Sequence, residues 1–123
     1  GHEAILPVED AVRHWHASPR AAVGFLVQAA AMGGASLGNR RALTLPGLSC
    51  TVAEQLAAME RVAGSKATRL VKRVPDETIR RIVSGWPQNF DAARAKSLGF
   101  SAESTFDEII KVHIEDELGG SIS

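Results

Sequence analysis

The residues best suited to chemistry lie in two short segments, "RHWH" and "RRIVSGW". An arginine fork binds a carboxylate or phosphate through two parallel hydrogen bonds, and a tryptophan ring offers a flat wall for a ligand. Arg13, Arg80, Arg81 and Trp86 are therefore candidate ligand contacts. A solvated charged face would have the same composition, so the residue types alone leave both interpretations open.

The histidines on either side of Trp15 raise the question of a metal site. On a strand, His14 and His16 would share a face, because side chains repeat every two residues. A zinc centre needs three or four ligands, and the other candidates, His113 and Cys50, are distant in sequence and lack ligand spacing. We therefore predict packed or surface imidazoles and assign no metal ligand.

Cys50 precedes a predicted helix, and a helix N-terminus can activate a thiol. A nucleophilic cysteine also needs a base held by a third group, and the sequence supplies none. Cys50 is predicted to be a small apolar filler.

The segment "GGASLG", at residues 33–38, has the composition of a phosphate-binding loop. Such a loop follows a strand and opens a helix, so that free backbone N–H groups meet the phosphate. Here it follows a helical pattern, which predicts a C-cap and turn instead.

These residues must be positioned by short elements. Strands are predicted where apolar or alternating segments end in proline or in a helix start, at residues 3–8, 13–17, 42–45 and 70–74. Helices are predicted from capping residues and apolar stripes, at residues 18–32, 51–64, 76–85, 91–98 and from 104 onward, where Ser104 with Asp107 gives the cap. The pattern indicates a small α+β domain.

The helix predicted for residues 18–32 is unusual, because Gln28 is its only polar side chain between Ala21 and Met32. A surface helix of a small domain normally has a polar stripe. Both sides of this helix should therefore be covered, by another chain or by a part of the protein outside these residues.

The composition argues against several classes of partner. Fourteen Lys and Arg balance fourteen Asp and Glu, so no attraction to nucleic acid or to an anionic membrane is expected. The uncharged run from Ala21 is broken at Gly33, well short of the roughly 20 apolar residues of a membrane span. A single cysteine fits a reducing cytoplasm. At 123 residues the chain is expected to form one domain.

Segments in three places, taken in order, resemble the C-terminal part of extended short-chain dehydrogenases/reductases, the NAD-dependent epimerase/dehydratase family. "VRHWHASPRAAVGFLVQAA" is similar to the family motif R-x-(Y/F)-(I/V)-H-V-x-D and its apolar helix. "RALTLPGLSCTVAEQLAAMERVAG" is similar to the s-v-x-E-l segment and a helix ending in glycine. "FDAARAKSLGFSAESTFDEIIKVHIEDE" is similar to the closing D-x-x-k-A-x-x-L-G-w and the last helix.

The resemblance implies a two-part enzyme, with an N-terminal Rossmann half that binds NAD and a C-terminal lobe that closes over the substrate. Residues 1–123 would be this small, helix-rich substrate-binding lobe with short strands, without the Rossmann half. The family's glycine-rich turn is absent, and its catalytic Tyr-x-x-x-Lys cannot be present because the chain contains no tyrosine. We therefore assign no catalytic or cofactor-binding residue and expect this fragment alone to be inactive.

The resemblance also suggests substrate contacts. In nucleotide-sugar epimerases of this family, the matching arginine and a second one upstream of D-x-x-k-A hold diphosphate. Arg13 and Arg81 are the nearest counterparts, with Trp86 beside the latter. Arg13 lies one residue nearer His16 than the family arginine, and Pro19 stands at the family aspartate. For a small sugar acid, one arginine would hold the carboxylate.

The function implied is NAD-dependent oxidation of a small sugar acid, such as D-erythronate, at a secondary hydroxyl in the cytoplasm. A nucleotide-sugar epimerase or dehydratase is the alternative within the family, and a helical interaction module is the alternative outside it. The expected partners are the sugar acid, the protein's own Rossmann half, onto whose sheet the helix at residues 18–32 would pack, and a further copy in a homo-oligomer.

Overall fold

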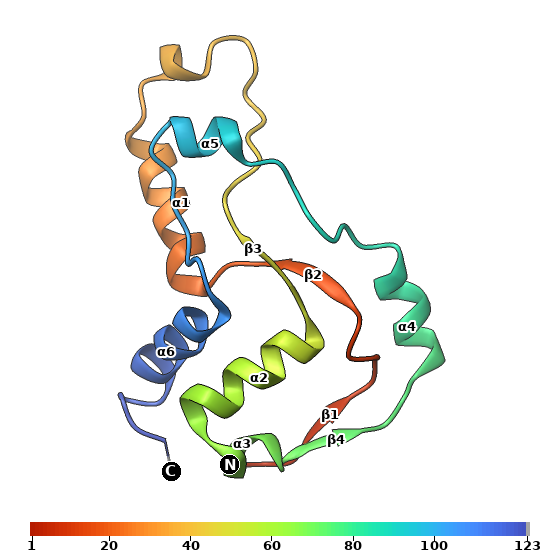
Figure 1. The fold of residues 1–123 in the computed structure, drawn as a ribbon. Helices are drawn as coiled ribbons and strands as arrows, with labels where there is room; N and C mark the ends of the chain where they lie inside the picture. Colours follow the sequence, from red (N-terminus) through yellow and green to blue (C-terminus); the bar gives the residue numbers. More distant parts are fainter. Residues whose placement is uncertain (123) are drawn as a thin grey trace.

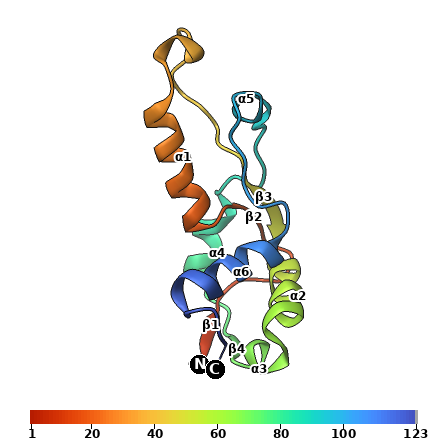
Figure 2. The ribbon, with the colours of Figure 1, turned by 90° about the vertical axis from the view of Figure 1, so that its left-hand side faces the viewer.

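A computed structural model describes residues 1–122 as an open arrangement of helices around two small sheets (Figure 1, Figure 2). The elements are β1 (Ala4–Leu6), β2 (Arg13–His16), α1 (Pro19–Ala31), the 3-10 helix η1 (Gly34–Leu37), β3 (Leu48–Thr51), α2 (Val52–Ala63), α3 (Ser65–Thr68), β4 (Val71–Arg73), α4 (Glu77–Ser84), α5 (Ala93–Ser97) and α6 (Phe106–Glu117). The predicted α+β class is confirmed.

The two sheets each contain two strands. β1 pairs with β4 in parallel, with Ala4 opposite Val71. β2 pairs with β3 in antiparallel register, with Arg13 opposite Thr51 and His16 opposite Leu48. Because β3 runs directly into α2, this register places the start of β2 beside the first turn of that helix.

The strand predicted at residues 42–45 is wrong, because this segment is coil and the strand begins at Leu48. Arg94 supplies the hydrogen bonds that a strand partner would otherwise give to this coil. The guanidinium of Arg94 donates to the carbonyl oxygens of Leu37, Arg40 and Ala42 at 2.8, 2.9 and 3.1 Å. The leucines at positions 43 and 45 pack against the core around α1 instead of alternating across a sheet.

Gly47 makes the approach to β3 possible. An added Cβ would lie 2.5 Å from Nε1 of Trp15 and 2.8 Å from the carbonyl oxygen of His16. The backbone therefore passes close to the indole ring, at a distance that only glycine permits. This contact places the start of β3 against β2.

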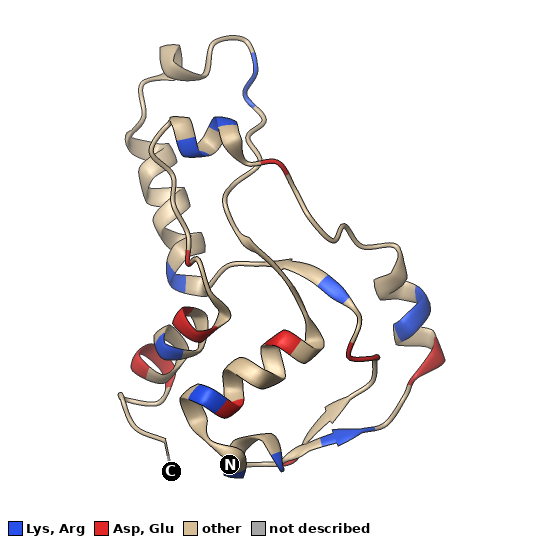
Figure 3. Ribbon diagram, in the orientation of Figure 1, with Lys and Arg blue, Asp and Glu red and all other residues tan. Residues whose placement is uncertain are grey.

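Helix α1 begins as predicted, with Ser18 as N-cap and Pro19 in the first position. Its inner face packs Phe25 against Phe100, with ring centroids 6.2 Å apart, and against Ala95. Beyond its first turn, the helix has no charged residue (Figure 3). None of the described helices is long and apolar enough to span a membrane.

The outer face of α1 is uncovered. Val23, Leu26 and Val27 are 61%, 70% and 65% exposed. A monomer of 13.1 kDa exposes roughly 6,400 Å² of surface, whereas this chain exposes 8079 Å². The excess of about 1,700 Å² is twice the roughly 800 Å² that one partner buries in a standard interface. The chain is therefore less compact than a monomer of its size.

Helix α6 is held by ion pairs on two sides. Arg61 of α2 makes a bidentate contact to Asp107 at 2.6 and 3.0 Å, and Arg20 of α1 reaches Glu115 and Asp116. The cap of α6 lies one residue later than predicted. Thr105 and Glu108, rather than Ser104 and Asp107, form the capping box, and the aspartate is paired with Arg61.

Ser18 is completely buried and its environment was not foreseen from the sequence. Its hydroxyl accepts from the N–H of Ala21 at 3.0 Å and donates to the carboxylate of Glu103, which also accepts from the Ser18 N–H at 3.2 Å. Glu103 thus fixes the start of α1 to the segment before α6.

We expect the contact between Ser18 and Glu103 to make the free energy of unfolding fall at acid pH. Burial alone would raise the pKa of Glu103, but the hydrogen bonds from Ser18, the backbone N–H of Glu103 and the charge of Arg20 together outweigh it, so the pKa is lowered. Because the pKa is lowered on folding, the ionised carboxylate stabilises the fold at pH values above the unfolded-state pKa of about 4.3. This stabilisation is lost as pH falls through the pKa of the folded state. Glu103→Gln should reduce the free energy of unfolding by about 1 kcal/mol at neutral pH. Urea unfolding from neutral to acid pH measures this, and parallel profiles for both proteins would contradict it.

Candidate functional site

A cleft of about 680 Å³ lies between α4 and the segment leading into β2. This volume is in the range of small-molecule sites, roughly 300 to 1,000 Å³. The charged residues that line it are Glu9, Arg13, Glu77, Arg80 and Arg81, joined by His14, Ser84 and Gln88.

Helix α4 presents one polar face to this cleft. Glu77, Arg80, Arg81 and Ser84 follow the helical spacing that places side chains on one side, and Asp76 caps the helix by accepting from the Ile79 N–H at 3.0 Å. The predicted separation of the arginines from the apolar stripe is therefore confirmed for Ile79 and Ile82. Those two side chains are 38% and 54% exposed. Val83, predicted with them, lines the cleft instead.

The arginines of the cleft differ in their partners. Arg80 pairs with Glu9 across the cleft and with Glu77 one turn away on α4, the latter at 2.7 Å. One cation thus meets two carboxylates. These carboxylates were not predicted as site residues, although the spacing from Glu77 to Arg80 on a short helix was a usable signal.

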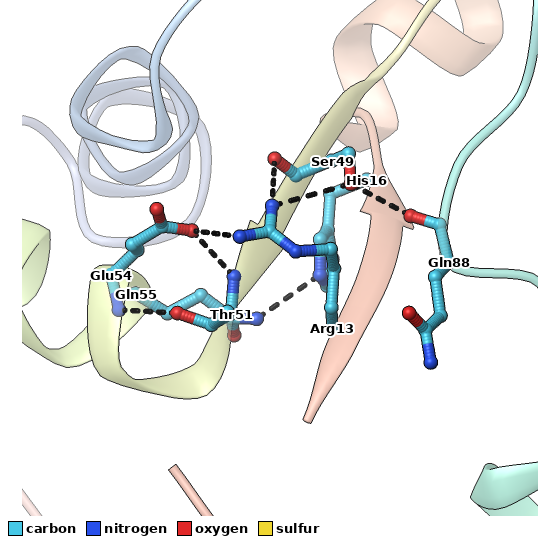
Figure 4. Close-up of polar contacts among 7 residues, drawn as sticks. All are labelled: Arg13, His16, Ser49, Thr51, Glu54, Gln55 and Gln88. Carbon is cyan, nitrogen blue, oxygen red and sulfur yellow. Dashed lines mark hydrogen bonds and ion pairs between the residues drawn. The ribbon is translucent and has the colours of Figure 1, made fainter. Parts of the chain in front are cut away.

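The guanidinium of Arg13 lies between Ser49 and Glu54 (Figure 4). It donates to the carbonyl oxygen of Ser49 at 3.0 Å and lies 3.5 Å from the Glu54 carboxylate. The Ser49 hydroxyl in turn donates to the carbonyl oxygen of Gln88 at 2.7 Å. Arg13 therefore lines the cleft, but its charge is already paired.

Arg81 is the exception among these arginines. It is exposed, it lines the cleft, and within residues 1–122 its guanidinium makes no hydrogen bond or ion pair. A guanidinium without an internal partner keeps its full capacity to bind an anion bidentately.

Trp86 lies beside the cleft without lining it. Its ring packs against His14, with centroids 5.3 Å apart, and the imidazole lines the cleft. The structure therefore brings Arg13 and Arg81 to one cleft and connects Trp86 to it through His14. The sequence analysis had predicted a packed or surface imidazole for His14 and no contact with a ligand site.

His14 and His16 both pack against other rings. Their centroids are 6.4 Å apart, and His16 meets Phe106 at 5.5 Å and the amide nitrogen of Gln55 at 3.0 Å (Figure 4). Burial, with a further contribution from His14, lowers the pKa of His16, which favours the neutral ring. No trio of His, Cys, Asp or Glu within residues 1–122 is placed to hold a metal ion.

Cys50 is buried in β3, which confirms its prediction as a filler. Burial raises the pKa of its thiol, and the charge of Glu54 raises it further. The thiol therefore stays protonated at neutral pH and is a poor nucleophile.

No family model matches the chain. It is similar to D-erythronate dehydrogenase of Cupriavidus necator, with 41% identity over 116 residues, which cover 94% of this chain and 36% of that protein. It is also similar to D-erythronate dehydrogenase of Haemophilus influenzae, with 32% identity, covering 96% of this chain and 38% of that protein.

The chain is also similar to parts of longer proteins whose structures have been solved. The nucleoside-diphosphate-sugar epimerase from Agrobacterium tumefaciens is 57% identical with a TM-score of 0.96, covering all of this chain and 36% of that one. The GalE-like L-threonine dehydrogenase from Cupriavidus necator, 18% identical with a TM-score of 0.74 over 94% of this chain and 41% of that one, shows the shared fold alone.

These matches confirm the resemblance predicted from the sequence. The chain corresponds to the C-terminal part of proteins of the epimerase/dehydrogenase family. It spans 36% to 38% of the length of the D-erythronate dehydrogenases that it matches.

Proposed function

We propose that the complete protein is an NAD-dependent dehydrogenase that oxidises a small sugar acid, such as D-erythronate, at a secondary hydroxyl. Residues 1–123 would supply its substrate-binding lobe. The observation that carries this proposal is the unpaired guanidinium of Arg81 in a cleft whose other arginines are already neutralised. One free cation matches the single carboxylate of a sugar acid, and a guanidinium holds a carboxylate through two parallel hydrogen bonds.

The other candidate is a nucleotide-sugar epimerase, which the 57% identity to the Agrobacterium tumefaciens protein favours. A diphosphate carries at least two charges and would need a second free arginine. To provide it, Arg13 would have to break its ion pair with Glu54, or Arg80 would have to leave its two carboxylate partners. The charge pattern therefore supports the sugar acid over the nucleotide sugar.

The glycine-rich segment at residues 33–38 does not have the setting of a dinucleotide-binding turn. The glycines at residues 33–38 follow α1 and form the 3-10 helix η1, whereas a phosphate-binding turn joins a strand to a helix. In this family NAD accepts a hydride from the substrate. Holding the cofactor and moving the proton would fall to the N-terminal half, while Arg81 binds and orients the carboxylate. Arg13 and Trp86 would shape the cleft, the latter by supporting His14.

The outer face of α1 would pack against the sheet of that N-terminal half. Its exposed Val23, Leu26 and Val27 and the excess surface of about 1,700 Å² support this arrangement. A helical interaction module would use the same face, and the coding sequence upstream of Gly1 distinguishes the two. A glycine-rich turn and a Tyr-x-x-x-Lys there would establish the enzyme.

The direct test is turnover by the complete protein. We expect NADH to form with D-erythronate or a related aldonate, and not with a nucleoside-diphosphate sugar. Epimerisation of a nucleotide sugar in the same preparation, without oxidation of any aldonate, would contradict the proposal and favour the second candidate.

A further inference from the structure

The Arg80 cluster, formed by Arg80 with Glu9 and Glu77, carries more negative than positive charge. Glu9 comes from the loop between β1 and β2, and Glu77 is the first residue of α4. Both reach the same guanidinium, so the cluster has one excess negative charge at neutral pH. It lies in the same cleft as Arg81, the next residue along α4.

We infer that Glu77 and Glu9 determine the charge selectivity of this site, so that it accepts a monoanionic sugar acid and rejects a dianion of the same size. This inference rests on the proposed function. A carboxylate bound at Arg81 uses the free cation of the cleft. A second negative charge on the same ligand would approach the Arg80 cluster and would be repelled by its excess carboxylate.

The two carboxylates are held in place by different means. Glu9 belongs to a turn closed by its carbonyl oxygen, which accepts from the Val12 N–H at 3.1 Å, and the next carbonyl, of Asp10, accepts from the Ala53 N–H at 2.9 Å. Glu77 is held by its contact to Arg80 within α4, and its side chain is 82% exposed. Glu77 can therefore be neutralised without breaking a contact between elements, which makes it the cleaner position to test.

The probes differ by one charge on one carbon skeleton. D-erythronate is a monoanion, and meso-tartrate is the same four-carbon acid with a second carboxylate in place of the terminal CH2OH. We would measure the KM for D-erythronate and the Ki of meso-tartrate in the complete protein, for the wild type, Glu77→Gln and Glu9→Gln. The ratio of Ki to KM reports selectivity independently of the overall binding strength.

In Glu77→Gln the ratio should fall by roughly threefold or more, the effect of one unit charge several ångströms away in a solvated cleft. The fall should shrink at high ionic strength, which a purely structural effect would not do. Glu117→Gln is the matched control, because it makes the same change in net charge on α6, outside the cleft, and should leave the ratio unchanged.

An unchanged ratio in both Glu77→Gln and Glu9→Gln, in an enzyme that oxidises D-erythronate, would overturn this inference and leave the proposed function intact. A wild type that oxidises no aldonate would instead refute the proposed function itself.

Discussion

Replacing Arg81 with alanine in the complete protein should lower kcat/KM for the sugar acid by about tenfold to a hundredfold. Hydrogen bonds to charged groups contribute about 1.5 to 3 kcal/mol each, and 1.36 kcal/mol corresponds to a factor of ten. Within residues 1–122 Arg81 has no internal partner whose loss would disturb the fold. The loss should therefore appear in substrate kinetics while the unfolding temperature and the affinity for NAD stay constant.

Two further variants sharpen this experiment. Arg81→Lys keeps the charge but loses the fork, so it should recover only part of the activity. Lys111→Ala removes the same charge from α6, outside the cleft, and should be neutral. Unaltered kinetics in Arg81→Ala would remove this residue from the site.

Leu26→Asp should have a much smaller effect on stability in the isolated chain than in the complete protein. In residues 1–123 the side chain is 70% exposed, so the substitution should change the free energy of unfolding by no more than about 0.5 kcal/mol. In the complete protein α1 would pack against the N-terminal half, and an unpaired charge buried there should cost about 3 kcal/mol or more. Denaturant unfolding of both proteins measures the difference.

The same variant tests association. An exposed apolar face of this size is expected to cause the isolated chain to self-associate, and Leu26→Asp should return it to a monomer in light scattering. Leu26→Ala separates the loss of apolar area from the gain of charge. Equal, small effects of Leu26→Asp in both proteins, with a monomeric wild-type chain, would show that nothing covers α1.

Local signals in the sequence predicted the helices well. Ser18 followed by Pro19, and Thr51 with Glu54, determine where α1 and α2 begin through hydrogen bonds made within a few residues. The cap of α6 was misplaced by one residue because two candidate boxes overlap. Thr105 with Glu108 matches the preferred S/T-x-x-E pattern better, and that comparison would have found it.

The strand at residues 42–45 was mispredicted because its conformation depends on distant residues. Arg94, about fifty positions later, supplies donors to the carbonyl oxygens around this segment, so the backbone needs no strand partner. Alternation of apolar residues over so short a run cannot report such a contact.

The site could be predicted only in part for the same reason. The resemblance and the residue types brought forward Arg13 and Arg81, which do line one cleft. Which arginine is free, however, depends on ion pairs with Glu9 and Glu54, whose positions relative to the arginines arise only in the folded chain. Charge pairing of this kind has no signature in sequence spacing.

The short strand β2 links the two surfaces on which the proposals depend. Arg13 at its first position lines the cleft, and Ser18, two residues after its last, begins the helix with the exposed apolar face. A register shift by one residue would turn every side chain of β2 to the opposite face. The ring contacts of His16 and the cleft position of Arg13 would then be lost together. If related proteins differ in the ligand that they bind, the substitutions responsible are therefore expected on α4, while the residues of β2 stay constant.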